Sequence, residues 1–260
     1  MREGLSRSVT IRRIDDITVA VAEISSAAKC GAAVAWIRNT VDDAIAGHNA
    51  LQQAGIEARL FHARFAMADR LRVEAEVLGR FGKVSTNRAG VVVATQVIEQ
   101  SLDLDFDLIV TDMAPADLII QRAGRLWRHS HRTDRPLHSP ELLLLGPEPK
   151  EDVQASWLSA TLAGTAYIYP ASLVWRSARA LLDAGTIETP DNIRTLVEAA
   201  YDESIALPSS LIRSDTESIA EGMVARSLAQ QNLLSLEKGY SVFSGPWDTE
   251  VTCPPKVPSI

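Results

Sequence analysis

Short apolar runs, several of them β-branched, alternate with longer segments of helical spacing between residues 32 and 145, and this alternation constrains the fold more than any other feature. The apolar runs cover residues 32–37, 58–61, 91–95, 108–111 and 142–145, and the helical segments cover residues 41–54, 69–78 and 116–123. Strands that alternate with helices form βαβ units, whose strands are parallel and whose crossovers are right-handed. The pattern therefore predicts an α/β fold in which helices sandwich a parallel sheet.

The pattern changes after Gly146 and Pro147. The following segments, near residues 152–162, 171–184, 191–202 and 215–237, have helical spacing without strands between them. We therefore expect four parts along the chain: a linker or frayed start at 1–15, an α/β lobe at 16–147, a C-terminal α-helical appendage at 148–238, and an extended segment at 239–260. The last segment would lead toward a further domain missing from this sequence.

Charge and composition narrow the class of partner. The net charge is −7, which by itself speaks against nucleic acid, but the segment from Gln121 to Arg135 holds five arginines and one aspartate. This concentration predicts a local anion site. Two distant cysteines, the lack of a secretory h-region, and apolar runs far shorter than the ~20 residues of a membrane span predict a soluble cytoplasmic protein.

The strongest local signal is Gln-Arg-Ala-Gly-Arg-Leu-Trp-Arg at residues 121–128. Arginines at offsets of three suit a polyphosphate, because each guanidinium forks onto phosphate oxygens and stays charged. Gly124 lets backbone come close to such a ligand. The alternative is a solvated basic helix end, and this motif taken alone favours neither interpretation over the other.

A second signal, residues 94–105, follows directly after an apolar strand. Loops at the carboxyl ends of parallel strands bind ligands in open α/β sheets. Thr95 and Gln96 would donate to a nucleic-acid backbone, and Asp103 or Asp105 would accept from a sugar hydroxyl or hold an arginine. The alternative is a polar loop with a helix N-cap.

The order and spacing of these two segments resemble motifs V and VI of superfamily 2 helicases. Residues 93–103 and 115–129 are more specifically similar to the CRISPR-associated helicase–nuclease of type I systems, as are Asn39-Thr40-Val41 and residues 60–65. The likeness covers roughly residues 30–250. It implies that residues 16–147 form a second RecA-like lobe carrying motifs IV to VI, followed by the helical appendage.

The resemblance also implies roles for particular residues. Arg125 and Arg128 would be arginine fingers on the γ-phosphate of ATP, where such a residue contributes roughly 10³–10⁵ in rate. The residues expected to position motif VI and to contact the nucleotide or the facing lobe are Gln121, Arg122, Gly124 and Asp103. Those expected along single-stranded DNA or its phosphates are Asn39, Thr40, His62, Arg64, Thr95, Gln96 and Gln100.

Other family motifs are not found in this sequence. A Walker A loop ends in Gly-Lys-Ser/Thr, whereas Gly82-Lys83 is followed by Val84, and there is no His-Asp dipeptide for a metal-dependent nuclease. We therefore expect no metal site here, and expect ATP with Mg²⁺ to be held mainly by a missing first lobe. That lobe and the nuclease domain would lie on another chain or a missing segment, and the chain would be inactive alone. An RNA-guided surveillance complex would be its further partner.

Two alternatives stay open. The absent Walker loop also suits a non-catalytic nucleic-acid-binding module or a gene remnant. The chain would otherwise be the C-terminal lobe of another superfamily 2 helicase, although Gln100-Ser101 stands where that class more often has Arg-Gly.

Overall fold

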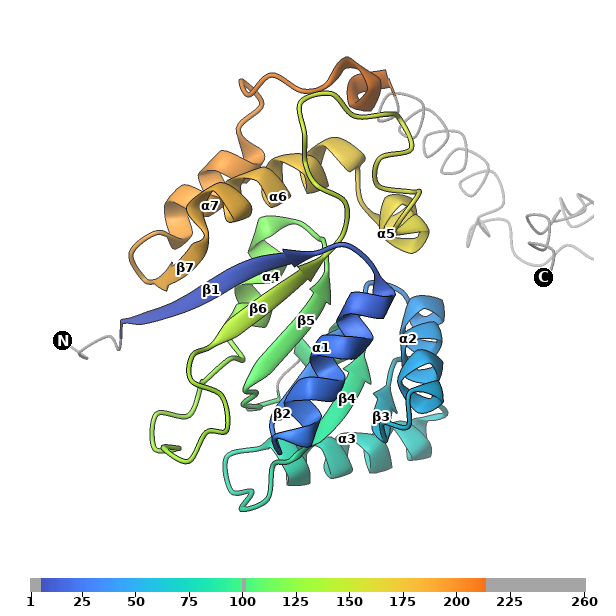
Figure 1. Ribbon diagram of the computed structural model, residues 1–260, viewed down its shortest axis with the longest axis vertical. Helices are drawn as coiled ribbons and strands as arrows, with labels where there is room; N and C mark the ends of the chain where they lie inside the picture. Colours follow the sequence, from blue (N-terminus) through green and yellow to red (C-terminus); the bar gives the residue numbers. More distant parts are fainter. Residues whose placement is uncertain (1–5, 100–101, 214–260) are drawn as a thin grey trace, which may run out of the picture. The chain divides into compact units, whose positions relative to one another are not determined.

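A seven-stranded sheet in the order β3-β4-β2-β5-β6-β1-β7 organises the chain in the computed structural model (Figure 1), which describes residues 6–99 and 102–213. All neighbouring strands are parallel except β7, which runs antiparallel to β1. The strands are β1 (Arg7–Ile14), β2 (Ala33–Ile37), β3 (Ala58–Phe61), β4 (Gly90–Ala94), β5 (Leu108–Asp112), β6 (Glu141–Leu145) and β7 (Thr186–Thr189). The prediction of an α/β fold with a parallel sheet is confirmed.

Helices cover both faces of the sheet. The helices of the lobe are α1 (Ile17–Lys29), α2 (Val41–Gln53), α3 (Met67–Phe81) and α4 (Ala116–Ala123), and a 3₁₀ turn, η1, spans Gln96–Glu99. In Figure 1, α1 and α2 lie in front of the sheet and α4 lies behind it. This division follows from right-handed crossovers, because the connections through α1 and α2 step along the sheet in the direction opposite to that through α4.

The central strands are buried on both faces. Every residue of β2 and of β5 is buried, as are four of the five residues of β4. Strands covered on both sides have continuous apolar runs, since neither face meets water. This is why these strands were recognisable from the sequence.

The expectation for residues 1–15 was wrong where the structure describes them, because β1 lies within that segment and pairs with β6 and β7. Val9, Ile11 and Ile14 are buried, whereas Thr10 and Arg12 between them are exposed. A strand with one solvated face alternates apolar and polar residues, and the exposed basic residues made this one resemble a frayed start.

The appendage differs in part from its prediction. It contains α5 (Ala163–Ile168), α6 (Ala171–Ala184) and α7 (Ile193–Tyr201), but residues 152–162, expected as a helix, form turns. Strand β7 lies between α6 and α7, where only helices were expected, and it joins the sheet. The helix expected at 215–237 and the extended segment at 239–260 lie outside the described residues. Within residues 6–99 and 102–213, each helix is too short or too polar to cross a membrane.

Candidate nucleotide-facing site

The carboxyl ends of three neighbouring strands bring the motif segments together. Ile37 at the end of β2 is in register with Ala94 of β4 and with Thr111 of β5. The residues after these strands therefore meet at one edge of the sheet. They are Arg38, Asn39 and Thr40 after β2, Thr95 and η1 after β4, and the turn into α4 after β5.

Arg122 on α4 lies inside the protein, not in a cleft. Its side chain is fully buried, and its guanidinium donates to Glu99 Oε1 at 2.8 Å, Thr111 Oγ1 at 2.7 Å and Asn39 Oδ1 at 3.1 Å. A buried guanidinium with a carboxylate and two neutral acceptors has its charge and its donors satisfied internally. Arg122 is therefore held inside the protein, and in this arrangement its guanidinium does not reach the surface where a nucleotide would bind.

Asn39 is buried beside Arg122, with 2% of its surface exposed. Its amide nitrogen donates to the Met113 carbonyl and to Thr165 Oγ1, both at 2.8 Å, and its amide oxygen accepts from Arg122. Its backbone N–H donates to Asp112 Oδ2 at 3.1 Å. With these groups occupied, Asn39 joins four segments of the protein, and both of its amide N–H groups are used internally and not for the DNA phosphate contact expected of it.

Arg125 follows α4 and reaches across to the loop after β4. Its guanidinium donates to the carbonyls of Glu99 and Leu102. Partial burial lowers the pKa of Arg125, and the nearby charge of Arg128 lowers it further. Residues 121–128, called here the arginine segment, are thus joined to the loop after β4 by hydrogen bonds from a side chain to the backbone.

Arg128 is the more open of the two expected fingers, with 44% of its side chain exposed. Its Nε donates to Asp103 Oδ1 at 2.7 Å, and His129 Nε2 lies 3.2 Å from the same oxygen. Burial alone would raise the pKa of Asp103, but the bonds to His129 and Arg128 leave that pKa lowered. Trp127, between the two arginines, has a left-handed backbone with φ 46°, which turns the chain there.

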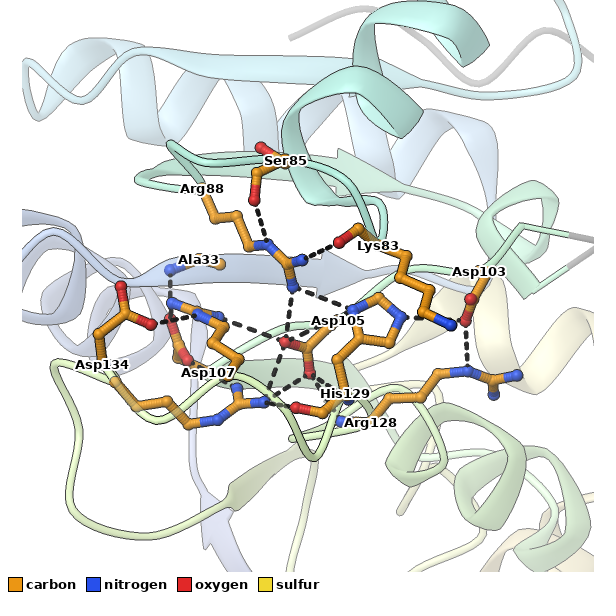
Figure 2. Close-up of polar contacts among 12 residues, drawn as sticks. Ala33, Lys83, Ser85, Arg88, Asp103, Asp105, Asp107, Arg128, His129 and Asp134 are labelled. Atoms are coloured by element: carbon orange, nitrogen blue, oxygen red, sulfur yellow. Dashed lines mark hydrogen bonds and ion pairs between the residues drawn. The ribbon is translucent and has the colours of Figure 1, made fainter.

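Two buried carboxylates neutralise much of the positive charge near the arginine segment (Figure 2). Asp105 contacts Arg88 at 2.9 Å and Arg135 at 3.0 Å, and Asp107 contacts Arg132 at 2.7 Å and Arg135 at 3.0 Å. Asp103 and Asp105 thus each hold an arginine, which is one of the two roles expected of them. Of the five arginines between residues 121 and 135, Arg122, Arg132 and Arg135 are paired with carboxylates and have side chains no more than 9% exposed, which leaves Arg125 and Arg128 as the candidates for an anion contact.

Gln121 and Gly124 complete the arginine segment. Gln121 is exposed on α4. Gly124 caps the helix, and a Cβ there would lie 2.9 Å from the Gln121 carbonyl oxygen. The glycine therefore allows the chain to leave α4 closely enough for Arg125 to reach the loop after β4.

Most side chains expected on the DNA strand are buried or already bonded. Thr95 is 4% exposed and Gln96 donates to the Asn39 carbonyl at 3.0 Å. The Thr40 hydroxyl accepts from the Asp43 N–H and donates to its carboxylate, so it caps α2. Gln100 lies outside the described residues.

His62 and Arg64 lie beyond β3 at the same edge. His62 is 6% exposed and stacks on Phe65 with ring centroids 4.2 Å apart. Burial lowers the pKa of His62, and the charge of Arg64 lowers it further. The Arg64 side chain is 65% exposed and ion-paired with Asp42 at 2.7 Å, so it is the member of the expected DNA-binding set that best offers a cation to solvent.

Sequence reasoning missed Glu99 and Thr165 as parts of this site. Glu99 could have been found, because it is the one carboxylate between β4 and Asp103, and the arginine-rich motif needs an acidic partner in a neighbouring segment. Thr165 has no comparable signal, since nothing marks a hydroxyl 126 residues away from Asn39 as its partner. In the described part of the chain, no three His, Cys, Asp or Glu side chains gather as they would around a metal ion.

Comparisons with known proteins point to one family. Residues 30–131 match the family model described as CRISPR-associated nuclease/helicase Cas3, C-terminal. The chain is 34% identical over 199 residues to CRISPR-associated endonuclease/helicase Cas3 of Escherichia coli strain K12, covering 74% of this chain and 21% of that protein. For Cas3 of Thermus thermophilus the identity is 34% over 180 residues, covering 69% and 18%. The chain spans about a fifth of the length of these curated relatives.

Solved structures extend the match to the appendage. The crystal structure of T. fusca Cas3 with ADP has a TM-score of 0.70 and 31% identity, covering 88% of this chain and 28% of that one. A structure described as a CRISPR RNA-guided surveillance complex, pre-nicking, has a TM-score of 0.67 and 30% identity, covering 88% and 29%. The sheet is thus that of a RecA-like helicase lobe, and the resemblance inferred from the motifs is confirmed.

Proposed function

We propose that this chain acts as the second motor lobe of a CRISPR-associated DNA helicase, because residues 30–131 match the Cas3 C-terminal family model. In this role it supplies Arg125 and Arg128 to ATP bound, with Mg²⁺, mainly by a first RecA-like lobe on another chain or segment. The chain alone does not hydrolyse ATP, because the sequence has no Walker A loop of its own. The solved Cas3 structures with bound ADP and AMPPNP support nucleotide binding by this family.

The observation that carries the proposal is the bonding of the arginine segment to the loop after β4. Arg125 donates to two carbonyls of that loop and Arg128 to Asp103 within it. A motion of the loop therefore moves the two arginines. In the other direction, an anion that binds to the arginines changes their bonds to the loop. Such a connection is what coupling of nucleotide state to a nucleic-acid strand requires.

Arg128 has the properties of a residue that can be recruited by phosphate. Its side chain is 44% exposed and its carboxylate partner Asp103 is 49% exposed, so the pair is accessible to solvent and weakly held. A γ-phosphate carries more negative charge than one carboxylate and accepts a forked guanidinium at least as well. Arg128 would therefore exchange Asp103 for phosphate when ATP is presented by the facing lobe.

The nucleic-acid partner in this proposal is single-stranded DNA lying along the carboxyl edge of the sheet, near Arg64. An RNA-guided surveillance complex would deliver that strand, in line with the Cas3-like structure described as such a complex. The nuclease domain, like the first lobe, would come from another chain or segment.

Reconstitution tests the proposal. The chain is mixed with a first-lobe protein that carries a Walker A loop, and ATP hydrolysis is measured with and without single-stranded DNA. We expect hydrolysis only in the mixture, with stimulation by DNA. A mixture no more active than the first-lobe protein alone would contradict the proposal.

A second candidate is a non-catalytic binding module, and the internal pairing of the arginines favours it. Arg122, Arg125, Arg128, Arg132 and Arg135 all have acceptors within the protein. This candidate predicts salt-sensitive binding to single-stranded DNA without stimulation of any ATPase.

A further inference from the structure

The appendage holds the arginine-bearing helix α4 at its start. Ser177 of α6 is fully buried, and its hydroxyl accepts from the Ala116 N–H at 3.1 Å, in place of a side-chain N-cap. Tyr201 of α7 donates to Asp117 Oδ1 at 2.9 Å. The first turn of α4 is therefore fixed by residues that lie outside the segment matched by the family model.

The short helix α5 is fixed to the motif segment after β2. Thr165 is fully buried and its hydroxyl accepts from Asn39 Nδ2 at 2.8 Å. The preceding residue, Gly164, lies so close to α2 that a Cβ would overlap Asp43 Oδ2 and would sit 2.5 Å from Thr40 Cγ2. Only a glycine at position 164 allows α5 to approach α2 this closely. The contact between Thr165 and Asn39 therefore depends on Gly164 as well as on the Thr165 hydroxyl.

The bonds of Asn39 fix which way its amide points. The amide nitrogen has its two hydrogens on Thr165 and on the Met113 carbonyl, and the amide oxygen accepts from Arg122. A flipped amide would place its hydrogens against a guanidinium, which is also a donor. Removal of the Thr165 hydroxyl leaves a buried N–H unsatisfied, at a cost that favours rearrangement of Asn39.

From Asn39 a continuous series of bonds leads to Arg125. Arg122 Nη2 bonds to Asn39 at 3.1 Å, Arg122 Nε bonds to Glu99 at 2.8 Å, and the Glu99 carbonyl accepts from Arg125 Nη2 at 2.8 Å. Arg122 and Asn39 are buried and Glu99 is nearly so, with 9% of its side chain exposed, so the bonds among these three side chains are shielded from water and are stronger than surface bonds. The last bond, from Arg125 to the Glu99 carbonyl, is part-buried.

We propose that Thr165 is a positioning residue for Arg125, acting through Asn39, Arg122 and Glu99, so that the docking of α5 sets the orientation of the Arg125 side chain. The inference rests on the proposed function for its catalytic consequence, although the bonded connection itself belongs to this chain alone. The appendage is thereby a part of the motor site: when α5 leaves the edge of the sheet, Arg125 loses its fixed orientation.

Hydrogen exchange on the isolated 260-residue chain tests the connection without any ATPase. Thr165→Val keeps the shape of the side chain and removes the hydroxyl, Thr165→Ser keeps the hydroxyl, and Thr161→Val changes an exposed threonine of the same segment as a control. We expect Thr165→Val to speed amide exchange at residues 121–128 by about threefold or more, with β6 unchanged. Thr165→Ser and Thr161→Val should match the parent. Gly164→Ala, which displaces α5 but keeps the hydroxyl, should speed exchange in the same segment.

Activity in a two-lobe protein containing this chain tests the catalytic consequence. Thr165→Val should lower kcat by about tenfold or more without change in KM for ATP, because a misplaced group costs rate more than binding. In an Asn39→Ala background, Thr165→Val should have no further effect, since the connection is already broken. Thr165→Ser should restore kcat.

The outcomes separate this inference from the proposed function. Unchanged exchange at 121–128 in folded Thr165→Val and Gly164→Ala proteins would overturn the inference. So would an unchanged kcat for Thr165→Val in a two-lobe protein that Arg125→Ala disables. If Arg125→Ala itself leaves kcat unchanged, the proposed function fails, and the exchange experiment still decides whether Thr165 orders the arginine segment.

Discussion

Arg128 donates from Nε to Asp103 Oδ1 at 2.7 Å, and this bond joins the arginine segment to the loop after β4 at the surface of the protein. The two side chains are 44% and 49% exposed. An exposed pair is screened by water and contributes little to folding. The bond is therefore suited to exchange of partners, and Arg128 can leave Asp103 without unfolding the segment.

A double-mutant cycle measures how weakly this pair is held. We expect Asp103→Asn, Arg128→Ala and the double variant to change the free energy of unfolding by less than about 1 kcal/mol, with a coupling in the same range. The lowered pKa of Asp103 means that its contribution is present above the ordinary carboxylate pKa and is lost as pH falls through the lowered value. Urea denaturation at pH 7 checks this, and a coupling of several kcal/mol would show a bond too strong to exchange.

Asp105, in contrast, is expected to be essential for folding. It is fully buried among Arg88, Arg132 and Arg135, so Asp105→Asn removes the carboxylate from the buried Arg88 and leaves Arg132 and Arg135 to share Asp107. Loss of one partner from a buried ion pair costs about 3–5 kcal/mol. Denaturant unfolding should show this loss, while Asp134→Asn, whose side chain is 89% exposed, should cost less than about 0.5 kcal/mol. Equal effects of the two variants would contradict the assignment.

The pKa of His62 should lie below its ordinary value of about 6.5, because burial and then the charge of Arg64 both disfavour protonation. NMR titration of the ring checks this. Arg64→Ala should raise the pKa but leave it below 6.5, since burial is the larger cause. The folded state is therefore favoured fully above pH 6.5, and this contribution is lost as pH falls through the lowered pKa. A pKa at or above 6.5 would show that burial does not control the protonation of this ring.

Arg64 should contribute one phosphate contact to single-stranded DNA. Arg64→Ala is expected to weaken binding and to reduce the slope of log K against log salt by about 0.7. Arg194→Ala provides a matched control, because Arg194 is also exposed and ion-paired but lies on α7. Fluorescence titrations between 50 and 200 mM salt, about the range over which such contacts are resolved, measure both. Equal slopes for the parent and Arg64→Ala would remove Arg64 from the DNA path.

The sequence was sufficient to predict the central strands β2, β4 and β5, because these strands are buried on both faces and therefore consist of continuous apolar runs. It was insufficient for β1, whose buried Val9, Ile11 and Ile14 are separated by polar and basic residues. Burial on one face gives an alternating pattern, and exposed arginines obscured it.

The partners of the motif residues could not be predicted from the sequence. Charge pattern alone suggested five available arginines, whereas Asp105 and Asp107 bind Arg132 and Arg135 inside the protein. A sequence shows which charges lie near each other along the chain, but the pairing of Asp105 with Arg88 and Arg135 is set by the fold.

The rate of ATP hydrolysis by a two-lobe protein containing this chain tests the central claim most directly. We expect Arg125→Ala and Arg128→Ala each to lower kcat by about 10³-fold or more, with KM for ATP changed far less, because a finger acts on the charge of the transition state. The free energy of unfolding of the Arg128→Ala protein should stay close to that of the parent, which separates lost chemistry from lost structure. Retention of the parental kcat by folded Arg125→Ala and Arg128→Ala proteins would contradict the assignment of these residues as arginine fingers.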